Sequence, residues 1–527
     1  MNSRLKKFLL LALALVLLFG VSRVQIVLNR DRNQLGLTRV EPLENAPPVL
    51  AFTTVALGGF RGLIANALWI RASDMQDQDK FFEMMQLADW ITKLEPHFVQ
   101  VWLVQAWNMA YNVSVKFKDL DDRWRWVRRG IELLRDDGLR FNPNEILIYR
   151  ELAWFFQHKM GQNLDDANMV YKQEWANEMA TVFGKLRRPN LDELVNPQTD
   201  EQRARAKLLR EKYKMDPAFM KQVDETYGPL EWRLPEAHAI YWAALGLEKA
   251  KENPSKVNPQ DLIQLRRVIY QSMHLAVQRG RLVENYIDKQ FEFGPNLDII
   301  PKTNFAYEQA MEEDAANREH ISRAHRNFLR LAVYFLYEHN RVADAAQWYK
   351  YLGEHYPDKT IIDGDTNSFP RNVTLDQYVM ANVQVDIKET DRSKVESAIE
   401  AFITRAYQSL ILGEDDQYAG FRMMARKVRQ SYMSQIEGSE KRIGIPPVEE
   451  TEKVVRNRML DPEQGMPYEY RVVLRRKLGM PPEPPPAEGT TVPATTNPPP
   501  SVSTNALASR GTNAPSARGT NAPAPRP

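Results

Sequence analysis

The sequence predicts an all-α protein in which pairs of helices stack side by side as an α-α solenoid. Three observations predict this class. Apolar residues recur at steps of three and four over most of the chain, which is the spacing of one helix face. Glycine is scarce, at 24 of 527 residues, and no series of alternating apolar segments indicates a sandwich or barrel. Finally, one kind of helical pair recurs along the chain.

The clearest pair lies at residues 326–357. Its apolar positions fall on one face of each helix: Phe328, Leu331, Ala332 and Phe335 in the first, and Ala345, Tyr349 and Leu352 in the second. A polar turn at 339–341 separates the helices, and Pro357 ends the second because proline cannot continue a helix. Such a hairpin leaves one apolar stripe uncovered, so it needs neighbouring pairs to pack against.

These positions resemble the tetratricopeptide repeat (TPR), a helical pair of about thirty-four residues. The first-helix signature returns nearer the N-terminus: Trp102 with Ala106, Tyr149 with Leu152, Ala153 and Phe156, and Trp242 with Leu245 and Gly246. Pro96 and Pro143 precede two of these units. Because the intervals between units exceed the ideal period, we expect degenerate repeats with insertions. The resemblance implies a protein-binding scaffold, and not an enzyme.

Residues 1–28 form a membrane-targeting segment in this interpretation. Three basic residues precede an uninterrupted apolar run at 8–21, and a second apolar piece ends at Leu28. As a helix the first run spans about 21 Å of a hydrocarbon layer about 30 Å thick, whereas extension to Leu28 crosses it. We therefore expect a single transmembrane anchor or a cleaved signal peptide. The basic flank predicts a cytoplasmic N-terminus in the inner membrane and a periplasmic body.

The rest of the chain divides by composition. The expected parts are a polar linker at 29–50, helical repeats at 51–184, a charged insertion at 185–232, and further repeats at 233–480 with a second insertion at 281–318. The centre of the second insertion, at 291–305, is expected to be an extended excursion. A short extended segment is also expected at 379–387, within a mixed loop at 358–390. Residues 481–527 are rich in Pro, Ala, Thr and Asn. Because they cannot offset the entropy of ordering, we expect a disordered tail.

Charge and composition exclude several classes of function. A formal net charge of +2 on 527 residues creates no field that would hold a nucleic acid. Without cysteine the chain has no disulfide, no thiolate metal site and no cysteine nucleophile. The eight histidines do not follow the spacing of a helical zinc site. No metal, cofactor or catalytic residue is therefore expected.

In a TPR-like array the first helices line a concave groove, and residues offset from the packing positions face it. The residues at these groove-facing positions are Trp107, Tyr111, Arg150, Trp154, His158, Arg326, Arg330 and Tyr337. Aromatic rings flanked by arginine are typical of interface hot spots, which suggests a peptide or helix of acidic character as the partner. Arg150 and Arg330 are expected to be solvated. The alternative for each aromatic residue is packing between repeats.

A second candidate site is the turn at 228–242, in which two prolines fix the backbone. It brings together Glu231, Trp232, Arg233, Glu236 and His238. Such a set suits a small active site, for example of a hydrolase acting on glycan or peptide, or a peptide clamp. The alternative is a capping turn that docks Trp232 on the next hairpin. Two hypotheses follow: a membrane-tethered scaffold for protein–protein interaction in the bacterial envelope, and an envelope enzyme.

Overall fold

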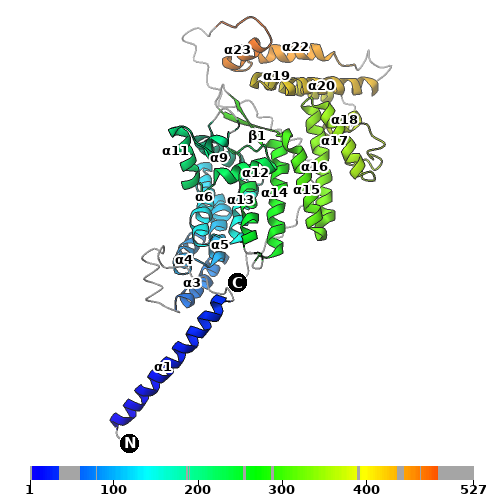
Figure 1. Ribbon diagram of the computed structural model, residues 1–527. Coiled ribbons are helices and arrows are strands. Elements are labelled where there is room, and N and C mark those ends of the chain that lie inside the picture. The colour runs from blue at the N-terminus through cyan, green and yellow to red at the C-terminus, as the bar shows by residue number, and fades with distance from the viewer. Residues whose placement is uncertain are drawn as a thin grey trace.

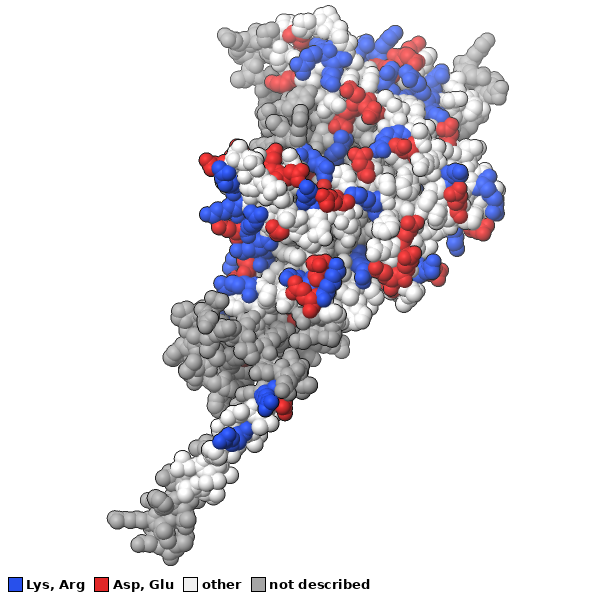
Figure 2. Space-filling model, in the orientation of Figure 1, with Lys and Arg blue, Asp and Glu red and all other residues white. Residues whose placement is uncertain are grey.

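The computed structural model describes residues 3–34 and 60–484, apart from short gaps at 79, 185–187, 189, 253, 255–256, 286–289, 388–391, 436–443 and 463. The described part is mostly helical, which confirms the all-α class (Figure 1). Most of the expected linker at 29–50 and nearly all of the expected tail at 481–527 lie outside the described residues. Figure 2 shows acidic and basic side chains interspersed over one face of the body.

Helix α1 (Ser3–Gln34) projects from the body as a single rod (Figure 1). Its described apolar side chains are more than half exposed; examples are Leu17 at 60% and Phe19 at 62%. Among the residues that the structure describes, no helix is long and apolar enough to cross a membrane. The side chains of residues 1–11, which include the start of the apolar run, lie outside the described residues.

The body begins with helical pairs. Its first helices are α3 (Phe60–Asp77), α4 (Phe81–Leu94), α5 (Val99–Trp107), α6 (Leu120–Glu132), α7 (Leu139–Phe141), α8 (Ile146–Trp154) and α9 (Asn168–Phe183). Three π-helical turns continue α5, α6 and α8: η2 (Asn108–Val113), η4 (Leu133–Gly138) and η5 (Phe155–Gly161). A 3-10 turn, η3 (Ser114–Lys116), follows η2.

One local contact recurs in two units and explains their shared signature. The Trp102 indole donates a hydrogen bond to the Pro96 carbonyl at 2.8 Å, and the Tyr149 hydroxyl donates to the Pro143 carbonyl at 2.7 Å. In both units the aromatic residue follows the proline by six positions and closes the turn before the helix. The Asn142 amide also donates to the Pro96 carbonyl at 2.9 Å, so it joins the two units.

The charged insertion at 185–232 contains three helices, α10 (Asp192–Val195), α11 (Asp200–Glu211) and α12 (Pro217–Tyr227). Thr199 and Gln202 form a capping box that starts α11. Leu209 and Met220 are fully buried and join the core of the preceding repeats. The insertion therefore packs on the array through a few apolar residues, while many of its charged side chains, such as Asp200 and Lys207, face solvent.

The second insertion is only partly extended. Strands β1 (Arg281–Asn285) and β2 (Gln290–Gly294) pair antiparallel, with Arg281 opposite Gly294. They are followed by a 3-10 turn, η7 (Leu297–Ile299), and by helix α15 (Ile300–Glu313). The expectation of an extended excursion is thus wrong for its second half, where Ile300, Tyr307 and Ala310 form a buried helical face.

The extended stretch expected within 358–390 is also wrong, because residues 375–387 form helix α18 (Leu375–Ile387). Thr374 and Gln377 exchange side-chain and backbone hydrogen bonds in the manner of a capping box. Tyr378 and Val379 are buried, and the Tyr378 hydroxyl donates to the Arg330 carbonyl at 2.8 Å. Burial of this helical face overrides the strand preference of its valines.

The remaining helices are α13 (Pro235–Glu252), α14 (Pro259–Arg279), α16 (Arg318–Glu338), α17 (Val342–His355), α19 (Arg392–Leu412), α20 (Asp415–Gln435), α22 (Val448–Met459) and α23 (Tyr468–Lys477), with a 3-10 turn, η8 (Ala315–Asn317), before α16. The hairpin predicted at 326–357 is confirmed as α16 and α17: Phe328, Ala332, Ala345 and Leu352 are fully buried. Asn340 takes a left-handed conformation, φ 59°, in its turn.

Two hydrophobic cores meet at α14. Leu265 and Met273 belong to the N-terminal core, whereas Ala276 and Val277 belong to the C-terminal core. In Figure 1, helices α19, α20, α22 and α23 run across one end of the stack that contains α14, α15 and α16. The array is therefore not a single row of parallel pairs.

Candidate functional site

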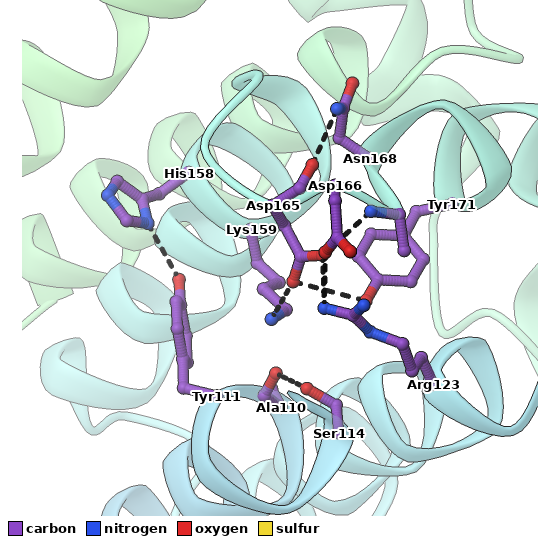
Figure 3. Close-up of polar contacts among 11 residues, drawn as sticks. Ala110, Tyr111, Ser114, Arg123, His158, Lys159, Asp165, Asp166, Asn168 and Tyr171 are labelled. Atoms are coloured by element: carbon purple, nitrogen blue, oxygen red, sulfur yellow. Dashed lines mark hydrogen bonds and ion pairs between the residues drawn. The ribbon is translucent and has the colours of Figure 1, made fainter. Parts of the chain in front are cut away.

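Four of the predicted binding residues come together on the first helices of two successive units. Trp107 stacks on Tyr111 with ring centroids 4.0 Å apart, and Trp154 stacks on His158 with centroids 4.5 Å apart. A hydrogen bond of 3.1 Å between the Tyr111 hydroxyl and His158 Nδ1 joins the two pairs (Figure 3). All four side chains are partly exposed. We call these four residues the aromatic cluster.

The local backbone places two of these rings. Tyr111 lies in the π-helical turn η2 and His158 in the π-helical turn η5. Such turns are rare and occur frequently at functional sites, since the extra residue in the turn re-aims the side chains that follow. Ser114 donates to the Ala110 carbonyl at 2.6 Å, which holds the end of η2 (Figure 3).

A buried ionic cluster lies behind the rings and is centred on Asp165. Its carboxylate accepts hydrogen bonds from Arg123 at 2.8 Å and from the Tyr171 hydroxyl at 3.3 Å, and it pairs with the Lys159 ammonium (Figure 3). The side chains of Asp165, Arg123 and Lys159 are at most 8% exposed. We call these four residues the Asp165 cluster.

The two clusters are connected through Lys159. Its ammonium lies 5.0 Å from the centroid of the Tyr111 ring, a cation–π distance, while it pairs with Asp165 on the other side. Lys159 also follows His158 directly in η5. Asp165 thus fixes the turn that carries His158, so the aromatic cluster is built on a rigid support.

Burial sets the charge state of the aromatic cluster. It lowers the pKa of His158 to about 4, with a further contribution from the Lys159 charge. It also raises the pKa of the nearby Glu151 carboxyl to about 7, against the influence of Arg150. Burial lowers the pKa of Lys159, although Asp165 partly restores it. At neutral pH the partly exposed rings therefore carry no charge, and their chemistry is that of stacking and apolar contact.

The predicted arginines are already engaged within the chain. Arg150 pairs with Asp261 of α14 at 2.6 Å, and Arg330 pairs with Asp363 at 3.0 Å. The Arg330 side chain is only 13% exposed. The expectation that these two residues are solvated is therefore wrong for Arg330, whereas Arg150 is paired but keeps 32% of its side chain exposed. Packing of α8 on α14, and of α16 on the loop that follows α17, supplies each guanidinium with a carboxylate.

The other predicted groove residues lie on α16, apart from the aromatic cluster. Arg326 is partly buried, and burial together with the Arg330 charge lowers its pKa. Tyr337 is buried, and its hydroxyl donates to Asp376 at 2.5 Å. The structure thus divides the predicted groove into an aromatic group on α5 and α8 and a separate, paired group on α16.

The 228–242 turn also comes together, but most of its polar atoms are already paired within the chain, and only His238 Nδ1 among these residues is buried without a hydrogen-bond partner in the described structure. Arg233 binds both carboxylate oxygens of Glu231, at 2.7 and 2.8 Å. His238 Nε2 lies 2.8 Å from the Trp232 carbonyl, and Glu236 pairs with Arg279 at 3.3 Å. All five predicted residues are less than 9% exposed. These contacts favour the capping turn, since fully buried Trp232 packs into the N-terminal core.

We expect acid to destabilise the fold through His238. Burial lowers its pKa from 6.5 to about 4, so the unfolded chain takes up the proton first as the pH falls from 6.5 to 4. Folding free energy is therefore lost over that range, by up to about 1.4 kcal/mol per pH unit. Urea unfolding of His238→Gln between pH 7 and 5 should show a shallower pH slope than the unsubstituted protein.

His320→Gln is the matched control, because His320 is exposed on α16. Its slope should equal that of the unsubstituted protein. If the slope for His238→Gln also equalled that of the unsubstituted protein, folding would not lower the pKa of His238.

Sequence reasoning missed the Asp165 cluster. The pair Asp165-Asp166 before a helix is a capping signal, and Asp165 does accept from the backbone amide of Ala167 at 2.9 Å. No local pattern shows that Arg123, 42 positions away, would also bind it. The described residues also contain no group of three His, Asp or Glu side chains placed to hold a metal ion.

Comparison of the chain with protein-family models, with curated proteins and with solved structures finds no match. The resemblance to tetratricopeptide repeats therefore rests on the residues quoted above and on the helical pairs they form.

Proposed function

We propose that this protein is a membrane-held helical scaffold of the bacterial envelope that binds another envelope protein along its first helices. The observation that carries the proposal is the aromatic cluster: four partly exposed rings, from two successive first helices, joined by stacking and one hydrogen bond. Aromatic residues grouped in this way are typical of the centre of protein interfaces.

The support behind the rings favours binding. Lys159 and Asp165 hold η5 from inside, so the rings lose little conformational freedom when a partner docks. Because the rings lose less conformational freedom on binding, the entropic cost of association is smaller. The Asp165 cluster therefore acts as a positioning element for the aromatic cluster.

The charges around the rings indicate the kind of partner segment. Arg150 is neutralised by Asp261, and His158 is uncharged at neutral pH because its pKa is lowered to about 4. An acidic peptide therefore finds no free cation on these two residues. We propose instead a peptide or helix that presents apolar or proline side chains to the rings.

Helix α1 supports the membrane part of the proposal. Its described apolar side chains, such as Leu17 and Val24, are 60% and 67% exposed, and water is an unfavourable environment for such a surface. The basic flank before the run supports a cytoplasmic N-terminus and a periplasmic body. A hydrolase site in the 228–242 turn has less support, because its polar side chains are buried and its carboxylates are paired with arginine.

Site-specific photo-crosslinking in cells tests the scaffold. Benzoylphenylalanine in place of Trp154 keeps an aromatic ring in the cluster and should give a discrete adduct with one envelope protein. The same residue in place of Lys350, whose side chain is 80% exposed on α17, is the control and should give none. No adduct at position 154, or equal adducts at both positions, would move the binding surface elsewhere.

A further inference from the structure

Exposed large apolar side chains are concentrated at one end of the body. Among the described residues outside α1 they are Leu63, Ile64, Ile70, Phe82, Trp90, Val115, Leu120, Leu164, Met169, Phe305 and Val454. Seven of these eleven lie between residues 63 and 120, on α3, on α4 and on the segment that leads into α6. This clustering is unlike the scattered single exposures on the rest of the body.

We propose that this end of the body, which we call the α3–α4 face, rests on the headgroup layer of the membrane. The inference rests on the proposed function, because it takes α1 as the membrane attachment. In Figure 1, α3 and α4 are the part of the body nearest to α1. A membrane that holds α1 therefore lies close to this face.

The side chains on the face suit the interface between lipid and water. Leu63 and Ile70, 65% and 64% exposed, lie seven positions apart and so share one side of α3. Phe82 packs edge-on against Trp126, with centroids 5.8 Å apart, and Trp90 is 47% exposed. Tryptophan is enriched at membrane interfaces, and phenylalanine and leucine form the membrane-facing side of interfacial helices.

The charges on the face favour lipid over an acidic protein partner. Two of the cations at this end are paired within the chain: Lys93 with Asp89 at 2.7 Å, and Arg125 with Asp122 at 2.8 Å. Residues 60–95 carry four basic and six acidic side chains, so the face has no excess of positive charge to attract an anionic partner. Contact with the membrane therefore depends on apolar and aromatic groups, and it should occur on zwitterionic lipid as well.

Single-cysteine labelling tests the proposal directly, because the chain has no cysteine of its own. The full chain is reconstituted in phosphatidylcholine vesicles with an NBD fluorophore at one of three positions. Ile70→Cys reports on the face, Leu17→Cys on α1, and Phe305→Cys on a distant helix, α15. The three side chains are matched at 64%, 60% and 65% exposed.

Spin-labelled lipid is then added to quench fluorophores that lie within the bilayer or its headgroup layer. We expect about a twofold loss of emission at position 70, since interfacial side chains lie about 5–10 Å into the headgroup boundary. Position 17 should lose at least as much and position 305 should lose none. The circular dichroism of each variant should match that of the unlabelled chain.

The outcomes separate the two proposals. If the label at position 17 is quenched and the label at position 70 is not, the α3–α4 face does not contact the membrane, but α1 still attaches the chain to it. If the label at position 70 is quenched and the label at position 17 is not, the α3–α4 face contacts the membrane and α1 does not attach the chain. Equal quenching at 70 and 305 shows non-specific adsorption and overturns the face. A label at position 70 can also be blue-shifted but not quenched, with an emission that depends on protein concentration. That result would mean that a second copy of the chain covers the position, and it would overturn the α3–α4 face.

Discussion

Replacing Asp165 with alanine is expected to destabilise the protein by about 3–5 kcal/mol, the usual cost of leaving buried charges without their partner. Asp165 receives hydrogen bonds from Arg123 and Lys159, whose side chains are 8% and 4% exposed. Without this carboxylate Lys159 loses its ion-pair partner in a site that water cannot easily reach, and Arg123 keeps only the exposed Asp166. Urea unfolding followed by circular dichroism measures the loss.

Asp166→Ala is the control for this prediction. Asp166 is the next residue and also pairs with Arg123, at 2.7 Å, but its side chain is 78% exposed. Water replaces an exposed carboxylate at little cost, so the free energy of unfolding should stay close to that of the unsubstituted protein. Equal losses for the two variants would contradict the central role of Asp165. The aromatic cluster should also lose its crosslink in Asp165→Ala, since Lys159 and η5 lose their support.

Gly420→Ala is expected to cost about 3 kcal/mol, at the upper end of the range for overpacked contacts. Gly420 lies on α20 at the point where this helix crosses the end of α16. A methyl group there would overlap the carbonyl oxygen of Glu338 and approach the Asn340 amide at 3.1 Å. These are backbone atoms, and the left-handed conformation of Asn340 leaves the turn little room to shift. Calorimetry should show a lower melting temperature.

Gly62→Ala provides the comparison, because Gly62 is also helical but has only Glu95 Oε1 nearby, at 3.8 Å. Alanine is the better helix former, so this variant should be more stable by about 0.5–1 kcal/mol. If Gly62→Ala lost as much stability as Gly420→Ala, the loss at Gly420 could not be assigned to the packing of α20 on α16 through Gly420.

Much of the helical architecture could be predicted from local patterns. Phe328, Ala332, Ala345 and Leu352 were assigned to the inner faces of a hairpin by their spacing alone, and all are fully buried. The prediction worked because a helix face is defined by residues three and four apart, which is information within one turn. The helix at 375–387 was not predicted: its valines favour a strand, whereas Thr374 and Gln377 carry the capping-box signal that starts the helix.

The candidate site was predicted only in part. The aromatic residues Trp107, Tyr111, Trp154 and His158 were selected from the repeat register, and the structure brings them together. The charged partners were not foreseen. Arg150 was expected to be solvated, yet it pairs with Asp261, which is 111 positions away.

The sequence by itself determined the helical class, the hairpin at 326–357 and the first-helix aromatics, because each depends on contacts within a helix or between adjacent helices. The tertiary structure alone decided which charges are paired and which side chains are covered. Asp165 meets Arg123, and Arg233 and His238 are buried, only because distant helices pack against one another. Ion pairing and burial depend on neighbours in space, and the spacing of residues along the chain does not encode them.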